Sequence, residues 1–349
     1  MNSFQDDLTK TLEGALEEIE GKILLLSLKA EEASSHVRRK QYLEKQREEI
    51  QKVLNEIYVS VGQEIKTKAV ELAEAMPGII HKITLAGLPV SEVEVGLAVP
   101  KLSKKQVVSW FESSQIEGSF FNDWMKKLET NTVSRVIAES RRSLVLTESV
   151  SKSSKRLQEA LNVSRNSART LFNTAMQEAV NFGELESYKA SPGIEKVLFV
   201  AELDLRTSPL CRELDGSIFD IEEAELHKPP LHPNCRSRLF PMFKDRDIYG
   251  LERAKRVGRK ETEPRTVHHR DGSTSKEYRE MEAELVPWKT TYNQWMTSMV
   301  TSEDPKDVAF AREALGPTRL NLVKDGKLKM DSLYYGGRLR TIKQLEELM

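Results

Sequence analysis

The sequence predicts a mainly α-helical protein with one small α+β module: long N-terminal helices, a central helical region, a compact mixed sheet and a helical C-terminal tail. Two observations lead to this fold class. Apolar residues recur three or four positions apart over most of the chain, which is the spacing of one face of a helix. One short stretch, residues 195–204, is instead apolar and β-branched between turn-forming residues, which is typical of a strand.

Residues 1–102 are expected to form an N-terminal helical arm that ends in a short β or loop segment. Two apolar stripes, which start at Leu8 and Ile50, continue at helical spacing. The second is expected to stop near Pro77, because proline lacks the N–H that a helix interior needs. Few charges and several β-branched, Gly and Pro residues predict short strands or an ordered loop over 79–102. The charged segment between the two stripes fits a subunit contact and a solvated helix face equally well.

Residues 103–192 are expected to form the central helical region. Ser103 is placed to cap its first helix. An aromatic group at helical spacing indicates a core or an interface rather than a ligand pocket. Its members are Trp110, Phe111, Phe120, Phe121 and Trp124. The serine-rich stretch 149–154 is expected to break the later part into two helices, with Asn162 or Ser164 capping the second.

Residues 193–245 are expected to form the compact α+β module. Its first strand is KVLFVAELD, and Asp215-Gly216 forms a turn at positive φ before a second short strand. A third strand, CRSRLFPMF, follows the proline-rich segment KPPLHPN. The polar residues 246–290 are expected to form an exposed arm or a long hairpin, and residues 291–349 return to helical spacing.

The overall charge does not indicate a nucleic-acid-binding protein, because 53 basic residues nearly balance 54 acidic ones and the net charge is −1. The sequence contains no run of eighteen apolar residues, so it predicts no membrane-spanning helix. The first ten residues lack the pattern of a signal peptide, and two cysteines are too few for a disulfide framework. We therefore expect a helix-rich protein assembled in a reducing cytoplasm.

The two cysteines and one histidine raise the question of a metal site. Cys211 follows Ser208 by three positions, and Cys235 follows His232 by three. Four such positions would suit tetrahedral zinc if all four were cysteine or histidine, but serine is a poor zinc ligand. A thiol enzyme would need a cysteine whose pKa is lowered by a neighbour, together with an orienting group that no motif supplies here.

A structural role is the favoured interpretation of these residues. Asp204, Thr207 and Asp215 would then bond turn backbones, while Cys211 and Cys235 pack as small buried hydrophobes. Prolines at 230 and 233 would fix the turn around His232, whose ring would bond Asp204 or a backbone carbonyl. We expect no catalytic residue, no metal and no cofactor. Zinc held by Cys211, His232 and Cys235, with water, Asp204 or Asp215 as the fourth ligand, remains the alternative.

The order of these segments resembles the Mu F-like domain of tailed-phage minor head proteins, also called phage head morphogenesis proteins. That family commonly has Asp-x-x-Thr-Cys-x-x-Cys-x-x-Leu-Asp-Gly and then Pro-Pro-x-His-Pro-x-Cys-Arg. The matching residues are Asp204, Thr207, Cys211, Leu214, Asp215, Gly216, Pro229, Pro230, His232, Pro233, Cys235 and Arg236. With the preceding helix SARTLFNTAMQEAVNFGELESY and the tail LGPTRLNLVKDGKLKMDSL, the resemblance covers about residues 110–349. Ser208 departs from the common cysteine, which counts against a four-ligand zinc site.

The resemblance implies a structural, non-enzymatic minor capsid protein. It implies several copies attached at the portal vertex inside the head, acting in head assembly and in DNA packaging or ejection. The implied partners are the portal protein and the major capsid protein, with possible contact to packaged DNA. The implied location is the virion, assembled in the host cytoplasm, with no membrane contact during assembly.

Two other functions are weighed against this one. Mu F-like domains also occur fused to effector domains, so an enzyme or toxin-like module is one alternative, although the chain lacks a phosphate loop, a His-Glu-x-x-His helix and a serine nucleophile elbow. A DNA-contacting internal head protein is the other. It would use the basic runs at 38–40, 253–260 and 268–270, which lack interleaved aromatics and are usually solvated surface.

Overall fold

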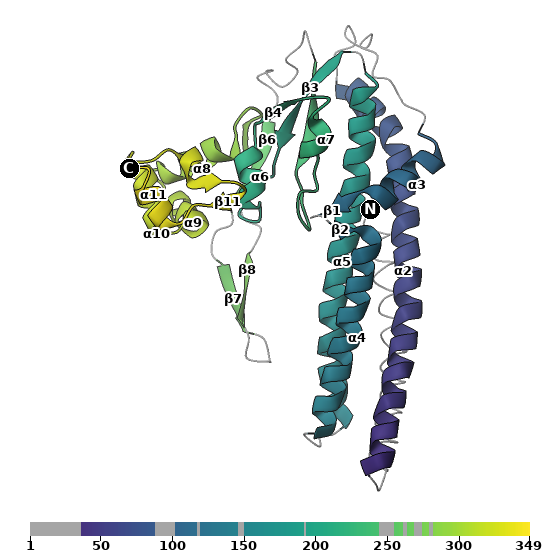
Figure 1. Ribbon diagram of the computed structural model, residues 1–349. Helices are drawn as coiled ribbons and strands as arrows, with labels where there is room; N and C mark the ends of the chain where they lie inside the picture. The colour runs from purple at the N-terminus through teal and green to yellow at the C-terminus, as the bar shows by residue number, and fades with distance from the viewer. Residues whose placement is uncertain are drawn as a thin grey trace. The chain divides into compact units, whose positions relative to one another are not determined.

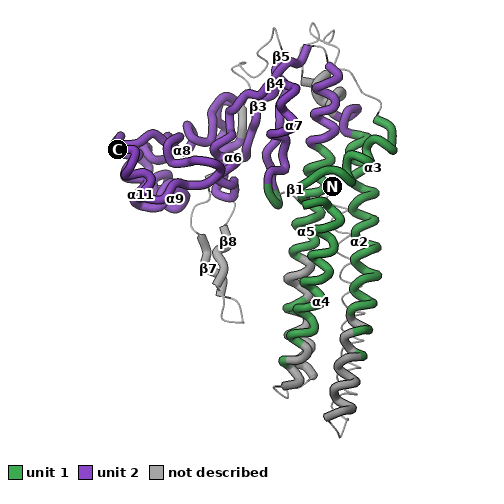
Figure 2. The backbone as a smooth tube through the Cα atoms, viewed as in Figure 1, with its two compact units in different colours: residues 1–75, 101–180, 232–234 green, residues 76–100, 181–231, 235–349 purple. Residues whose placement is uncertain are grey.

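The computed structural model confirms a mainly helical chain with small antiparallel sheets (Figure 1). The structure describes residues 36–87, 102–116, 119–145, 150–191, 193–243, 255–260, 264–268, 274–278 and 282–349. The expected helix that starts at Leu8, and residues 88–101 of the expected loop, lie outside this range. The chain divides into two compact units (Figure 2). Unit 1 comprises residues 1–75, 101–180 and 232–234, and unit 2 comprises 76–100, 181–231 and 235–349.

Unit 1 is built from long helices. They are α2 (His36–Gly87), α3 (Lys104–Ser113), α4 (Phe121–Val145) and α5 (Val150–Lys189), and α2 and α5 each continue into unit 2. Polar contacts tie neighbouring helices together: Tyr58 Oη bonds Thr132 Oγ1 at 2.8 Å, and Arg156 Nη1 lies 3.3 Å from Glu139 Oε2. Of the predicted aromatic group, Phe111 and Phe121 are buried, with ring centroids 5.0 Å apart, so these two members belong to the core.

Two details of the helix prediction were wrong, and one short hairpin was not predicted. Helix α2 does not stop at Pro77 but continues to Gly87, so residues 79–87 are helical. Both Met76 and Pro77 are buried, and this burial offsets the hydrogen bond that the proline removes. Asn162 and Ser164 are not caps, because α5 already begins at Val150. The short hairpin of β1 (Gln115–Ile116) and β2 (Ser119–Phe120) was not predicted at all.

The cap at Ser103 is confirmed. Its hydroxyl accepts from the backbone N–H of Gln106, and the Gln106 side chain accepts from the backbone N–H of Ser103. This reciprocal pair satisfies two backbone donors that the first turn of α3 would otherwise leave unpaired.

The module in unit 2 contains the three predicted strands. The antiparallel order is β4 (Ile218–Asp220), β3 (Ile194–Val200) and β5 (Arg238–Phe243), with β3 in the middle. Two short helices, α6 (Pro209–Leu214) and α7 (Ala224–His227), complete it. Residues from β3, β5, α5 and the cysteine segments share one core, which includes Leu185, Val197, Phe199, Cys211, Cys235 and Leu239.

The polar stretch after the sheet forms two antiparallel strand pairs, in agreement with the expected long hairpin. The outer pair is β6 (Lys255–Lys260) with β9 (Glu282–Pro287), and the inner pair is β7 (Pro264–His268) with β8 (Thr274–Tyr278). It is not wholly exposed, because Val286 is buried in the same core as the C-terminal helices.

The C-terminal tail is helical, as predicted. Its elements are α8 (Tyr292–Val300), α9 (Pro305–Leu315), α10 (Pro317–Lys324), the 3₁₀-helix η2 (Met330–Leu333), a hairpin of β10 (Tyr334–Tyr335) and β11 (Arg338–Leu339), and α11 (Ile342–Glu346). Trp295 is the centre of its core, with ring centroids 5.6 Å from Tyr292 and 5.5 Å from Phe310. The hairpin was not predicted. Among the residues that the structure describes, no helix has the length and apolar character needed to cross a membrane.

Candidate functional site

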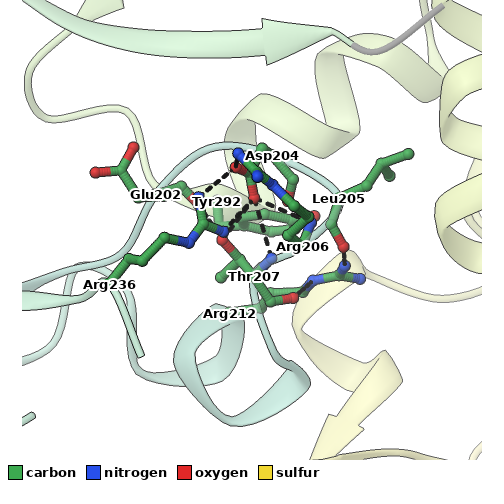
Figure 3. A network of polar contacts seen from close by, with 8 residues as sticks. All are labelled: Glu202, Asp204, Leu205, Arg206, Thr207, Arg212, Arg236 and Tyr292. Carbon is green, nitrogen blue, oxygen red and sulfur yellow. Dashed lines mark hydrogen bonds and ion pairs between the residues drawn. The ribbon is translucent and has the colours of Figure 1, made fainter. Parts of the chain in front are cut away.

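Asp204 organises the loop that follows β3 (Figure 3). Its side chain is fully buried, and its Oδ1 accepts hydrogen bonds from the backbone N–H groups of Arg206 and Thr207, each at 3.0 Å. The Thr207 hydroxyl donates to the carbonyl of Glu202 at 2.6 Å. This is the turn-forming role expected of an aspartate and a threonine at these positions.

Arg236 provides the opposite charge. Its Nη1 donates to Asp204 Oδ2 at 2.5 Å and its Nη2 to Oδ1 at 2.7 Å, in a bidentate pair. The expected hydrogen bond from His232 to Asp204 is not formed, because Asp204 is bound by Arg236, Arg206 and Thr207 instead. Burial raises the pKa of Asp204, but the hydrogen bonds and charge of Arg236 outweigh it, so the pKa lies below its ordinary value. The carboxylate is therefore held ionised.

Two further residues hold the same loop, and neither was anticipated from the sequence. The buried Arg212 donates from Nε to the carbonyl of Thr207 at 2.7 Å and from Nη2 to that of Leu205 at 2.8 Å. Its guanidinium lies over the ring of Tyr292, 4.8 Å from the centroid, and the Tyr292 hydroxyl donates to the Asp204 carbonyl at 3.1 Å. The sequence did offer one signal for Arg212, because it is a charged residue within the largely apolar segment PLCREL of α6. Nothing local pointed to Tyr292, which lies 88 residues after Asp204.

Asp215 and Gly216 link the sheet to the C-terminal helices. Asp215 Oδ1 accepts from the backbone N–H of Ala201 at 2.7 Å, and Oδ2 from that of Tyr292 at 2.6 Å. The aspartate thus bonds two distant backbone groups, where a bond within its own turn was expected. Gly216 has φ +86°, as predicted, and a Cβ there would lie 2.5 Å from Thr291 Cγ2. Glycine is required at this position for both reasons.

The two cysteines are buried and are not joined in a disulfide, and their sulfurs are 3.7 Å apart. The hydrogen bond with the Cys235 thiol and burial both raise the pKa of Cys211. Cys211 is therefore held as a thiol, which is the opposite of what a nucleophile requires. Small buried cysteines were expected here.

The donors for a metal lie close together but number three. The ligand atoms of Cys211, His232 and Cys235 are all within 4.8 Å of one another. Ser208 is the N-cap of α6, where its hydroxyl accepts from the backbone N–H of Cys211 at 3.3 Å. Tetrahedral zinc would need a fourth ligand that this position does not offer.

The His-Pro-Asn segment is fixed by local backbone contacts. His232 Nδ1 donates to the carbonyl of Pro233 at 3.0 Å. A bond from the ring to a backbone carbonyl was one of the two expected possibilities. The carbonyl belongs to the next residue in the chain. Asn234 has φ +55°, which asparagine tolerates better than most residues. Its backbone N–H donates to Thr174 Oγ1 at 3.0 Å and its Nδ2 to Thr170 Oγ1 at 3.2 Å.

Glu184 on α5 is a buried acid that sequence reasoning missed. One carboxylate oxygen lies 3.4 Å from Arg238 Nη1, and the other is buried without a hydrogen-bond partner among the described residues. Burial raises the pKa of Glu184 to about 7, and the charge of Arg238 opposes this only in part. The group changes its charge near neutral pH.

Comparison with known proteins bears directly on these residues. Residues 117–240 match the family model for phage Mu protein F like proteins, which confirms the resemblance for roughly a third of the chain. The matched region contains Asp204, Cys211, Asp215, His232 and Arg236. No curated protein and no solved structure shows a significant match to the chain.

Proposed function

We propose that this chain, which is similar to phage Mu protein F over residues 117–240, is a structural minor head protein of a tailed phage. The match supports a phage head morphogenesis protein in general, a component of the virion that interacts with other head components. The finer proposal is attachment of several copies at the portal vertex inside the head. There the protein would contact the portal protein and the major capsid protein, and act in head assembly and in DNA packaging or ejection.

The observation that carries this proposal is that buried polar side chains in the matched region bond the protein's own backbone. Asp204, Asp215 and Arg212 are buried, and their side chains form hydrogen bonds to backbone groups of this fold. A catalytic group needs reach to a substrate and a pKa suited to proton transfer. These residues instead hold loops in place, which is what a rigid docking platform requires.

Co-sedimentation tests the proposal. Purified full-length protein is mixed with assembled portal rings and, separately, with capsids made without it, and then centrifuged through sucrose. We expect saturable binding to portal rings. The matched pair of variants is Arg236→Ala, which removes the partner of a buried carboxylate, and Lys196→Ala, which removes an exposed partner of Asp220.

The expected outcome is that Lys196→Ala binds like the natural protein while Arg236→Ala loses binding in proportion to its loss of folded protein. Absence of binding to both portal rings and capsids by a folded protein would contradict the proposal. Binding to capsids alone would move the attachment site away from the portal.

A further inference from the structure

The end of the chain carries a local excess of positive charge that the overall balance hides. Residues 324–343 contain six basic residues and two acidic ones, Asp325 and Asp331, within a chain of net charge −1. The basic residues are Lys324, Lys327, Lys329, Arg338, Arg340 and Lys343. All are exposed except Arg340, which is half-buried. The excess therefore lies on the surface.

These cations have no acidic partner among the residues that the structure describes. Around the sheet, several basic side chains are neutralised by ion pairs: Lys196 with Asp220, Lys228 with Glu225 and Arg238 with Glu184. Over residues 324–343, by contrast, no basic side chain forms an ion pair with any residue described in the structure. Unneutralised surface cations attract a polyanion, and counterion release then drives its binding.

The hairpin of β10 and β11 places an aromatic ring beside two of these charges, Arg338 and Arg340. Tyr335 pairs with Arg338 across the hairpin, and Arg340 follows Arg338 by two positions, so all three belong to one face. The Arg340 guanidinium lies 4.6 Å from the centroid of the Tyr335 ring, yet Tyr335 is 69% exposed. One side of the ring is thus backed by a cation while the ring remains accessible.

The hairpin is rigid enough to act as a preformed site. Gly336 and Gly337 both have positive φ, 58° and 76°, as a tight two-residue hairpin turn requires. The Gly337 N–H donates to Glu213 Oε2 at 2.6 Å, and a Cβ on Gly337 would lie 2.9 Å from Leu210 Cδ1. The tip is therefore packed closely against α6.

We propose that this surface binds DNA, with the cations on phosphates and Tyr335 stacked on an unpaired base. Exposed aromatic rings beside arginine are the elements that single-stranded nucleic acid uses, since every base offers a π-face. An acidic protein would use the charges but not the ring, so the ring favours nucleic acid. This surface is separate in sequence from the basic runs at 38–40, 253–260 and 268–270. This inference does not depend on where the protein lies in the head.

Fluorescence anisotropy on the full-length protein tests it, with a labelled oligothymidine of about 20 nucleotides, a duplex of equal length, and salt varied at fixed pH. We expect log K to fall with log salt with a slope of about −3 for the single strand, which corresponds to about four phosphate contacts. Lys324→Gln with Lys327→Gln and Lys329→Gln should reduce that slope to about −1. Tyr335→Leu should weaken single-strand binding at least about 5-fold and leave duplex binding unchanged.

The matched control is Lys104→Gln with Lys105→Gln, which removes exposed charges on α3. It should change neither slope nor affinity, and melting curves should show that every variant is folded. A flat salt dependence, an equal loss in the α3 control, or duplex binding as sensitive to Tyr335→Leu as single-strand binding would overturn the proposal. Equal competition by polyglutamate would assign the surface to an acidic protein instead.

Discussion

Arg236 and Asp204 form a bidentate ion pair across 32 residues of sequence, in which the carboxylate is fully buried and the guanidinium is about one-third exposed. The pair joins the loop after β3 to the segment that precedes β5. It closes the two halves of the motif, which is the role that sequence reasoning had given to His232.

Removing Arg236 should strongly destabilise the protein, because the buried carboxylate of Asp204 would lose its bidentate partner and keep only the exposed cation of Arg206, 3.5 Å away. We expect Arg236→Ala to cost about 2–4 kcal/mol in unfolding free energy, and Lys196→Ala, whose pair with Asp220 is exposed, to cost less than about 1 kcal/mol. Urea denaturation monitored by circular dichroism measures both. Equal losses of unfolding free energy in the two variants would mean that burial does not strengthen the Arg236–Asp204 pair.

The Arg236 effect should also depend on pH. Asp204 has a lowered pKa, so its stabilising contribution is present above the ordinary carboxyl pKa and is lost as the pH falls through the lowered value. The stability difference between the natural protein and Arg236→Ala should therefore shrink in acid. A difference that stays constant from neutral pH to about pH 3 would contradict this assignment.

Gly216 should tolerate no side chain, for two separable reasons. Gly216→Ala places a Cβ against Thr291 Cγ2 and forces alanine to positive φ. Thr291→Ser removes that methyl group but keeps the hydroxyl that caps α8, so the double variant should recover the steric part and retain a backbone cost of about 1–2 kcal/mol. Gly193→Ala, where nothing lies within 4 Å, is the control. Thermal melting that ranks Gly216→Ala with Gly193→Ala would refute the argument.

Glu184 should make the protein less stable as the pH rises through neutrality. Its folded-state pKa of about 7 is above the ordinary value, so its contribution is complete below about pH 4.5 and is lost as the pH rises through 7. The loss is on the order of 3 kcal/mol. Glu184→Gln should flatten this part of the melting-temperature profile between about pH 5 and 8, whereas the exposed Glu222→Gln should not. Parallel profiles for all three proteins would sink the prediction.

The cysteine and histidine donors should not retain zinc. Three donors lie together, but Ser208 caps α6, and the carboxylates of Asp204 and Asp215 bond other groups, so the fourth ligand would have to be water. Elemental analysis of protein purified without chelator should give much less than one zinc per chain. A metal that is stoichiometric, survives dialysis and disappears in Cys235→Ala would show that the donors form a metal centre.

His232 should behave as part of a scaffold. We expect His232→Ala to lower the melting temperature and the incorporation into heads together, because the ring supports the turn through its bond to Pro233. Both are measured on the same preparation. Normal stability and incorporation with a loss of infectivity would instead indicate an active-site residue.

Local signals explain what the sequence could predict. The strand at Ile194–Val200, the cap at Ser103 and the positive φ at Gly216 each depend on a few neighbouring residues, and each was identified. The contact of Arg212 with Tyr292 depends on how distant segments pack, so no local pattern carries it. Pro77 shows the reverse error, in which a strong local rule was outweighed by burial.

The hydrogen bond between Asp215 and the backbone of Tyr292 determines how far a fragment must extend in order to fold. The family match ends at residue 240, yet a fragment cut there would lose the donor to Asp215 Oδ2, the donor to the Asp204 carbonyl and the ring beneath Arg212. Each loss leaves a buried polar or charged group exposed to water or without a partner. A boundary chosen by sequence similarity would therefore yield an unstable product, and a fragment meant to fold must extend through α8.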